Sequence, residues 1–209
     1  MLVNFLKEKS KPAVAYIIGA IVALSYIVYS IAFDVINENA NQFYVALTVV
    51  FAGLIALISF GIAKKNKVMT LGFIVALLGY FNFAQLQDSF SYFSAANTYF
   101  KFDYDASGVF EIMIGIFAIL MFIVGLLFVL GKFAFKNRAV KEVFGYVIIF
   151  ASAAAAVLMI IAFIIQCTQV KDWGKEWNII FYYIAMILYP VFVFVASTLT
   201  ESFSDKAAE

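Results

Sequence analysis

Residues 109–131 read VFEIMIGIFAILMFIVGLLFVLG, an unbroken apolar run in which Glu111 is the only charged residue. A helix rises about 1.5 Å per residue, so about 20 apolar residues cross the hydrocarbon core of a bilayer. The strands of a membrane barrel alternate apolar and polar residues, and this run does not. It therefore predicts a transmembrane helix, because backbone groups in lipid must form their hydrogen bonds within their own segment.

Similar apolar runs recur along the whole chain, separated by short polar breaks. The predicted spans are 12–33, 43–63, 68–87, 109–131, 146–168 and 178–199. Of the 209 residues, 66% are hydrophobic and 13% are charged, which is more apolar than a soluble core of this size requires. The fold class predicted is an all-α integral membrane protein, a six-transmembrane-helix bundle that forms one domain over residues 1–209.

Lysine and arginine indicate the orientation, because cytoplasmic loops retain positive charge. Ten of the fourteen basic residues fall on one side of the predicted spans: Lys7, Lys9, Lys11, Lys64, Lys65, Lys67, Lys132, Lys136, Arg138 and Lys141. The opposite loops contain Lys101, Lys171 and Lys175, and the tail adds Lys206 to the basic side. We therefore expect three helical hairpins with the N-terminus and the C-terminus in the cytoplasm. The preference for lysine over arginine is typical of AT-rich bacterial genomes, which favours a bacterial plasma (inner) membrane.

Composition argues against several functional classes. The formal net charge of +1 provides no basic surface for nucleic acid. Cys167 is the only cysteine and histidine is absent, so the chain has no internal disulfide and no multi-cysteine metal site. No nucleophile has a base beside it, and carboxylates do not cluster in the spans. We expect a protein that is not an enzyme and has no cofactor, apart from the calcium hypothesis below.

Small residues recur at helical spacing in two of the predicted spans. The first span contains Ala15, Gly19 and Ala23, and the fifth contains the run 152–156, which reads SAAAA. Small side chains let helix backbones approach closely in a membrane, where packing drives association. We expect these faces to pack inside the bundle, and the alternative is that they contact a partner subunit.

Polar side chains collect toward the predicted outer ends of the spans. The candidate ligand-binding residues are Tyr29, Asn82, Gln85, Glu111, Gln166, Asn178 and Tyr182. An ionisable group inside a membrane is costly and suggests function, which selects Glu111. If these groups face inward, they line an outward-facing polar cavity for a small molecule or lipid. Alternatively, Glu111 is a helix-start carboxylate, the tyrosines form an interfacial belt and the amides bond neighbouring helices.

The predicted outer loop, residues 88–108, is rich in aromatic residues. It is interpreted as a segment resting on the membrane, as a lid over the cavity or as a docking surface for another protein. Its end contains Asp103, Asp105 and Ser107 followed by Gly108, a pattern similar to the opening of an EF-hand calcium loop. The twelfth position of that register is Ile114, where a glutamate is expected. The hypotheses for these residues are a calcium site, an ordinary turn into the fourth span and, for Asp103 and Asp105 alone, a pair similar to the metal-binding D-x-D of sugar transferases.

Two functions remain open on the sequence. The first is a non-enzymatic accessory or assembly subunit of a membrane complex, whose partner is another membrane protein or a second copy. The alternative is a solute-binding or transport subunit that uses the outward-facing cavity. Six helices in 209 residues resemble the architecture of the substrate-capturing subunits of energy-coupling-factor vitamin importers, although the Gly- and Pro-rich loops expected of that family are absent.

Overall fold

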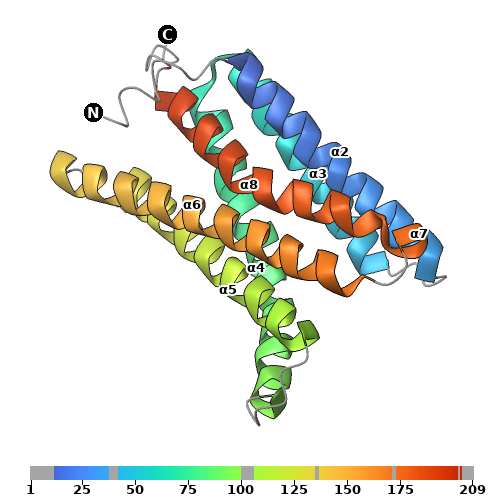
Figure 1. Cartoon of the computed structure of the whole chain (residues 1–209). Helices are drawn as coiled ribbons and strands as arrows, with labels where there is room; N and C mark the ends of the chain where they lie inside the picture. The colour runs from blue at the N-terminus through green and yellow to red at the C-terminus, as the bar shows by residue number, and fades with distance from the viewer. Residues whose placement is uncertain are drawn as a thin grey trace. The chain divides into compact units, whose positions relative to one another are not determined.

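The computed structural model describes residues 12–37, 42–99, 106–134, 137–170, 173–201 and 203, and the regular structure of these residues is helical throughout. The elements are α2 (Pro12–Asn37), α3 (Gln42–Ala63), α4 (Lys67–Tyr99), α5 (Ala106–Val129), the π-helical turn η1 (Leu130–Ala134), α6 (Arg138–Gln169), α7 (Trp173–Glu176) and α8 (Asn178–Glu201) (Figure 1).

Six stretches of these helices are long and apolar enough to cross a membrane. They are Pro12–Phe33, Val45–Ala63, Lys67–Ala84, Ile112–Ala134, Ala139–Thr168 and Asn178–Thr200. Each coincides with a predicted span, so the prediction of an all-helical chain with six long apolar helices is confirmed. These six stretches are consistent with a multi-pass membrane protein.

Helix α4 is longer than its apolar run. It was expected to end near residue 87, but the helical backbone continues to Tyr99, so most of the predicted outer loop before residue 100 is helical. The sequence contains no glycine and no proline between Gly79 and Gly108, and nothing between them forces the backbone out of the helix. Hydropathy locates the apolar part of a helix, and it does not detect a polar extension.

Helix α6 also begins earlier than its apolar run. Asn137 has extended backbone angles, φ −67° and ψ 124°, and its side-chain oxygen accepts a hydrogen bond from the amide of Ala139 at 2.9 Å. This is an N-cap, which satisfies one of the amides that the first turn leaves without a helical partner. The cap starts the helix at Arg138 rather than at the predicted residue 146.

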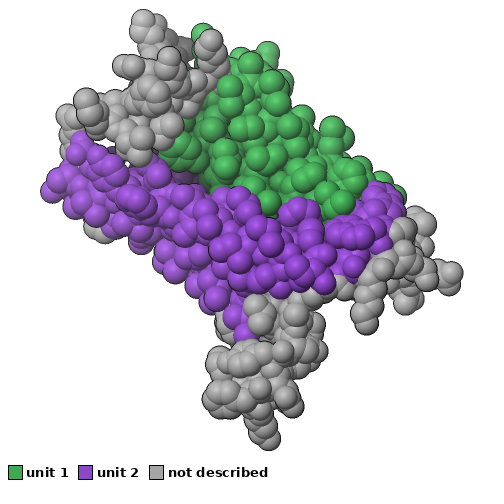
Figure 2. Space-filling view, in the orientation of Figure 1, with its two compact units in different colours: residues 1–77, 178–209 green, residues 78–177 purple. Residues whose placement is uncertain are grey.

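The chain divides into two compact units (Figure 2). Unit 1 contains residues 1–77 and 178–209, and unit 2 contains residues 78–177. Helix α4 contributes its first residues to unit 1 and the rest to unit 2. The prediction of a single membrane domain stays a prediction.

In unit 1, α8 packs antiparallel against α2. Tyr29 of α2 lies beside Tyr182 near the start of α8, and Gly19 lies beside Phe192 nearly three turns further along. Helix α2 also lies antiparallel to α3 (Figure 1). The start of α2, the end of α3 and the end of α8 therefore lie at the same end of unit 1.

Gly19 brings α2 close to both of its neighbours. A Cβ atom added at Gly19 would lie 2.7 Å from Cε2 of Phe192 and 3.2 Å from Cγ2 of Ile55 in α3. Ala15, one turn earlier, is fully buried. The prediction that the small-residue face of the first span packs inside the protein is therefore confirmed at Ala15 and Gly19, whereas Ala23 is half-buried.

In unit 2, α5 packs against α4 and α6. Gly125 of α5 lies beside Leu78 of α4, and Gly131 of η1 lies beside Phe144 of α6, so both neighbours approach at glycine. The run 152–156 of α6 has two sides, because Ser152 and Ala155 are buried while the two alanines between them are exposed. The prediction that this run packs inside the protein holds for one side of the helix.

Candidate functional site

The predicted ligand-binding residues belong to two different units. Unit 1 contains Tyr29, Asn178 and Tyr182, and unit 2 contains Asn82 and Gln166. Gln85 lies in α4 and Glu111 in α5, but their side chains lie outside the described part of the structure. The single polar cavity expected from the sequence therefore stays a prediction, and each group is described here within its own unit.

Tyr29 and Tyr182 are brought together in unit 1. Their ring centroids are 5.0 Å apart with an interplanar angle of 52°, a favourable tilted arrangement. Both tyrosines are half-buried. Asn178, at the start of α8, is buried and lies one turn before Tyr182 on the same helix. Three of the predicted residues thus come from the paired ends of α2 and α8.

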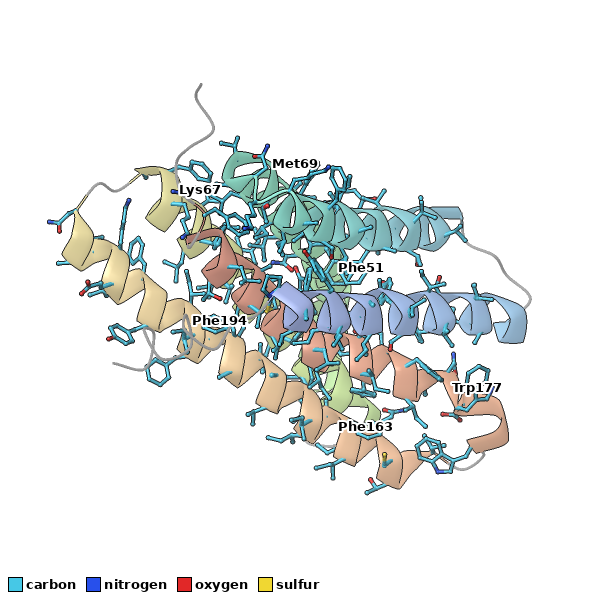
Figure 3. All side chains as sticks on the ribbon, turned by 90° about the horizontal axis from the view of Figure 1, so that it is seen from above. Phe51, Lys67, Met69, Phe163, Trp177 and Phe194 are labelled. Carbon is cyan, nitrogen blue, oxygen red and sulfur yellow. The ribbon has the colours of Figure 1, made fainter. Side chains whose placement is uncertain are left out.

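This pair belongs to a larger group of rings that we call the aromatic cluster. Its members are Tyr26, Tyr29, Phe33, Phe51, Tyr182, Tyr183 and Tyr189. Phe51 of α3, which is labelled in Figure 3, joins the helices, since its ring lies 4.8 Å from that of Tyr26 and 5.7 Å from that of Tyr189. The cluster therefore connects α2, α3 and α8 through aromatic contacts.

The chemistry of the aromatic cluster changes along the helices. Tyr183 and Tyr189 are fully buried, whereas Tyr29 and Tyr182 retain an accessible part. Aromatic faces bind apolar rings and organic cations, and phenol hydroxyls can both donate and accept hydrogen bonds. The accessible edge of the cluster thus has the groups that recognise a small aromatic or cationic solute.

Two hydroxyls form a hydrogen bond close to the aromatic cluster. Oγ1 of Thr48 donates to Oγ of Ser30 at 2.9 Å, and both residues are buried. Ser30 directly follows Tyr29 in α2, and Thr48 lies one turn before Phe51 in α3. The bond links α2 to α3 and satisfies two polar groups that water does not reach.

Asn82 forms a hydrogen bond between helices in unit 2. Its side chain is 1% exposed, and Nδ2 donates to the backbone carbonyl of Met121 in α5 at 2.7 Å. Gly125, one turn further along α5, leaves room for the amide, since a Cβ there would lie 3.5 Å from Nδ2. The geometry is that of an amide bonding neighbouring helices, one of the two interpretations that the sequence left open.

Gln166 lies near the end of α6, and its backbone carbonyl accepts the amide of Val170 at 3.1 Å. Its side chain is half-buried, as is that of the neighbouring Cys167. The hydrogen bond to Val170 belongs to the last turn of α6. It does not decide whether the Gln166 side chain serves a ligand.

The residues of the calcium hypothesis lie largely outside the described part of the structure. Asp103 and Asp105 are not described, and Ser107 is described only as part of the helical backbone of α5. Among the residues whose placement is described, no group of three or more aspartate, glutamate, cysteine or histidine side chains could hold a metal ion. Calcium binding stays a prediction.

Sequence reasoning missed Phe33, Phe51, Tyr183 and Tyr189, which complete the aromatic cluster. Tyr182 and Tyr189 are seven residues apart, a spacing that places them on one face of a helix. This was the available signal. It does not reveal that Phe51 of a different helix lies between Tyr189 and Tyr26, because the sequence does not state which helices are neighbours.

Comparisons with protein-family models, with curated proteins and with solved structures find no match to this chain.

Proposed function

We propose that the chain is a non-enzymatic subunit of a membrane assembly, inserted in a bacterial plasma membrane with both termini in the cytoplasm. Six apolar helices support insertion. The orientation is supported by the lysines of the α3–α4 turn, which lie at the same end of unit 1 as the start of α2 and the end of α8. Cytoplasmic ends carry the positive charge.

The observation that carries the assembly proposal is the small-residue run in α6. Ser152 and Ala155 are buried, while Ala153 and Ala154 are exposed on the other side of the helix. Large apolar side chains fill the lipid-facing surface well, whereas small ones let a second helix backbone approach closely. An exposed pair of alanines in a span therefore favours a helix of a partner protein as the contact.

The same helix has the smallest buried share of the six spans. Of the residues in its most apolar stretch, 22% are buried, against 50% in α8. Its exposed side contains Phe150 and Val157, which lie about one turn on either side of the two alanines, and Ile161, which lies two turns beyond Ala154. Large side chains around a small-residue centre form the shape into which a neighbouring helix fits.

The test is the mass of the complex extracted gently from its own cells with a tagged chain. We expect a species larger than the monomer that contains one stoichiometric partner, or a second copy of the chain. Ala154→Phe should release the chain as a monomer, since a bulky ring prevents close helix approach. Val49→Phe is the control, because Val49 is 66% exposed on α3 and its enlargement leaves α6 unchanged.

Two results would overturn the assembly proposal. The first is a wild-type chain that is a stable monomer without a partner after extraction in several mild detergents. The second is an Ala154→Phe variant that keeps its partner as fully as Val49→Phe does. The helical content of each variant, measured by circular dichroism, separates loss of assembly from loss of fold.

A second candidate function is solute binding or transport, and the accessible edge of the aromatic cluster favours it. Tyr29 and Tyr182 contact each other there, and Asn178 lies one turn away. Rings, hydroxyls and an amide in one place match a small aromatic or cationic solute. The binding groups proposed are in unit 1 and do not depend on Glu111.

A thermal-shift screen of vitamins, lipids and organic cations tests this second function. A ligand present at one hundred times its Kd adds about 2.7 kcal/mol to stability, which raises the melting temperature by a few degrees. Tyr182→Phe should reduce that shift, while Tyr80→Phe, at a 42% exposed tyrosine of α4, should leave it unchanged. A wild-type protein that no compound stabilises would remove the support for this function.

A further inference from the structure

The turn between α3 and α4 is held by a dense set of backbone and side-chain bonds. The amide of Asn66 donates to the carbonyl of Gly61, and the amide of Lys65 donates to that of Ile62, both at 3.0 Å. These two bonds form a Schellman motif, which ends α3. Lys65 has a φ of 51° at the left-handed position of the motif.

Asn66 then starts α4 directly. Its Oδ1 accepts the amide of Met69 at 3.0 Å, and its carbonyl accepts the hydroxyl of Thr70 at 2.7 Å. Thr70 also lies against Gly61, where an added Cβ would be 3.2 Å from the Thr70 backbone. Figure 3 shows Lys67 and Met69 beside the end of α3. The turn is short and its geometry is closely determined.

The turn concentrates positive charge without any acidic residue. Lys64, Lys65 and Lys67 lie within four residues, and the sequence has no aspartate or glutamate between Glu38 and Asp88. Lys64 and Lys65 are exposed and Lys67 is half-buried. Neither α3 nor the membrane-spanning part of α4 therefore supplies a carboxylate beside Lys64 and Lys65.

Lys64 contacts the apolar surface at the end of α3. Its Nζ lies 5.6 Å from the ring centroid of Phe60, one turn back along α3, and Phe60 is itself 51% exposed. A lysine at the end of a span extends its stem along the apolar surface and places its ammonium group at headgroup depth. The Lys64 side chain extends back along α3 over the Phe60 ring.

We propose that the α3–α4 turn binds the phosphate of an anionic phospholipid headgroup. Lys64 and Lys65, both exposed at one end of a helical hairpin, complement the negative charge of such a headgroup, and a zwitterionic lipid carries no net charge to match them. The α4 amide end, which faces the same turn, adds a partial positive charge. The inference rests on the membrane insertion proposed above and is independent of the assembly partner.

The test measures which lipid lies beside the turn. A single tryptophan reporter is placed at Val68, which is 80% exposed in the first turn of α4, in a Trp173→Phe, Trp177→Phe background that removes both native tryptophans. The chain is reconstituted in vesicles that contain brominated phosphatidylglycerol or brominated phosphatidylcholine. Bromine quenches tryptophan at short range, so the ratio of the two quenching efficiencies reports lipid preference.

We expect several-fold preferential quenching by the anionic lipid, since each basic residue near the surface contributes on the order of fivefold in affinity. Lys64→Gln, Lys65→Gln and Lys67→Gln together should bring the ratio to one. The matched control removes the same number of charges from the predicted outer loops, through Lys101→Gln, Lys171→Gln and Lys175→Gln, and should keep the preference. Lys64→Gln and Lys67→Gln, each tested alone, should reduce the preference for the anionic lipid partially. These single variants provide the test if the triple variant fails to fold.

The outcomes distinguish a failure of headgroup binding from a failure of membrane insertion. Equal quenching by both lipids in the reporter protein, or a preference that the control triple abolishes as fully as the turn triple, would overturn headgroup binding while insertion stands. Absence of quenching by either lipid would overturn membrane insertion, and the headgroup site with it. Loss of the preference in inorganic phosphate, relative to chloride of equal ionic strength, would assign the turn to free phosphate and overturn the lipid.

Discussion

Lys65 has a backbone conformation that lysine rarely adopts, and glycine or asparagine is the usual residue at this position of a Schellman motif. The left-handed conformation costs a non-glycine residue about 1–2 kcal/mol. The amides of Lys65 and Asn66 hold it there through their bonds to the last turn of α3. A local cost at a charged position is one reason to look for a role for that charge.

Lys65→Gly should raise the free energy of unfolding by about 0.5–1 kcal/mol. Glycine adopts this φ without strain, and the gain is reduced by the larger conformational freedom of glycine in the unfolded chain. SDS-induced unfolding in mixed micelles measures the change. Lys65→Ala, which retains the strain, should show no gain, and equal stability of the alanine and glycine variants would refute the explanation.

Asn82 provides a second prediction at this scale. Asn82→Ala should lower the free energy of unfolding by about 0.6–1.7 kcal/mol, which runs from the mean to the maximum measured for hydrogen bonds between transmembrane helices. Ser59→Ala is the control, since Oγ of Ser59 bonds to the carbonyl of Ile55 within its own helix. If Asn82→Ala and Ser59→Ala had the same small effect, the bond to Met121 would not be what Asn82 contributes.

The sequence identified individual polar residues that form specific contacts, but it did not identify the residues that they contact. Asn82 and Tyr29 were identified as polar groups in apolar spans, and both form specific contacts. The sequence left open whether Asn82 faces a cavity or a neighbouring helix, because both arrangements place an amide on the same helix face. Only the position of the Met121 carbonyl distinguishes them.

At the scale of the elements, the centres of the spans were predictable and their ends were not. An apolar run of about 20 residues has one physical solution in a bilayer, so hydropathy locates each span. The end of α4 at Tyr99 and the start of α6 at Arg138 depend instead on capping and on the absence of helix breakers. Those signals act in polar sequence, where hydropathy carries no information.

The pairing of α2 with α8 can be tested at Gly19. Gly19→Ala should destabilise the protein by about 1–3 kcal/mol, because the new Cβ would overlap the ring of Phe192. Phe192→Leu in the same chain should recover part of that loss, and the coupling energy in a double-mutant cycle should be at least about 0.5 kcal/mol. Gly53→Ala is the control, since no atom lies within 4 Å of its added Cβ. Additive effects of the two substitutions would contradict the pairing.

At the scale of the whole molecule, the division into two units was not predictable. Helix pairing in a membrane depends on side-chain fit, which a hydropathy pattern does not contain. The sequence predicted sequential hairpins, and α2 does pack on α3, but α2 also has α8 as an extensively packed neighbour. A contact between the first and last helices is visible only after the chain has folded.

The proposed orientation gives a prediction for the intact cell. In a Cys167→Ser background, a cysteine replacing Lys65 should react with a membrane-impermeant maleimide only after the cells are permeabilised. A cysteine replacing Trp173, a 40% exposed residue of α7, should react in intact cells. The physical reason is the retention of lysine on the cytoplasmic side. The reverse pattern of labelling would show the opposite orientation.

Unit 1 is assembled from two separated parts of the sequence, and this has a consequence for synthesis. The ribosome produces α2 and α3 first, but α8 follows only after the 100 residues of unit 2. At about 5–20 residues per second, α2 and α3 wait roughly 5–20 s for that neighbour. During this interval the side of α2 around Gly19 that later contacts Phe192 is uncovered, and for the membrane insertion proposed above we expect a translocon or insertase to shield it.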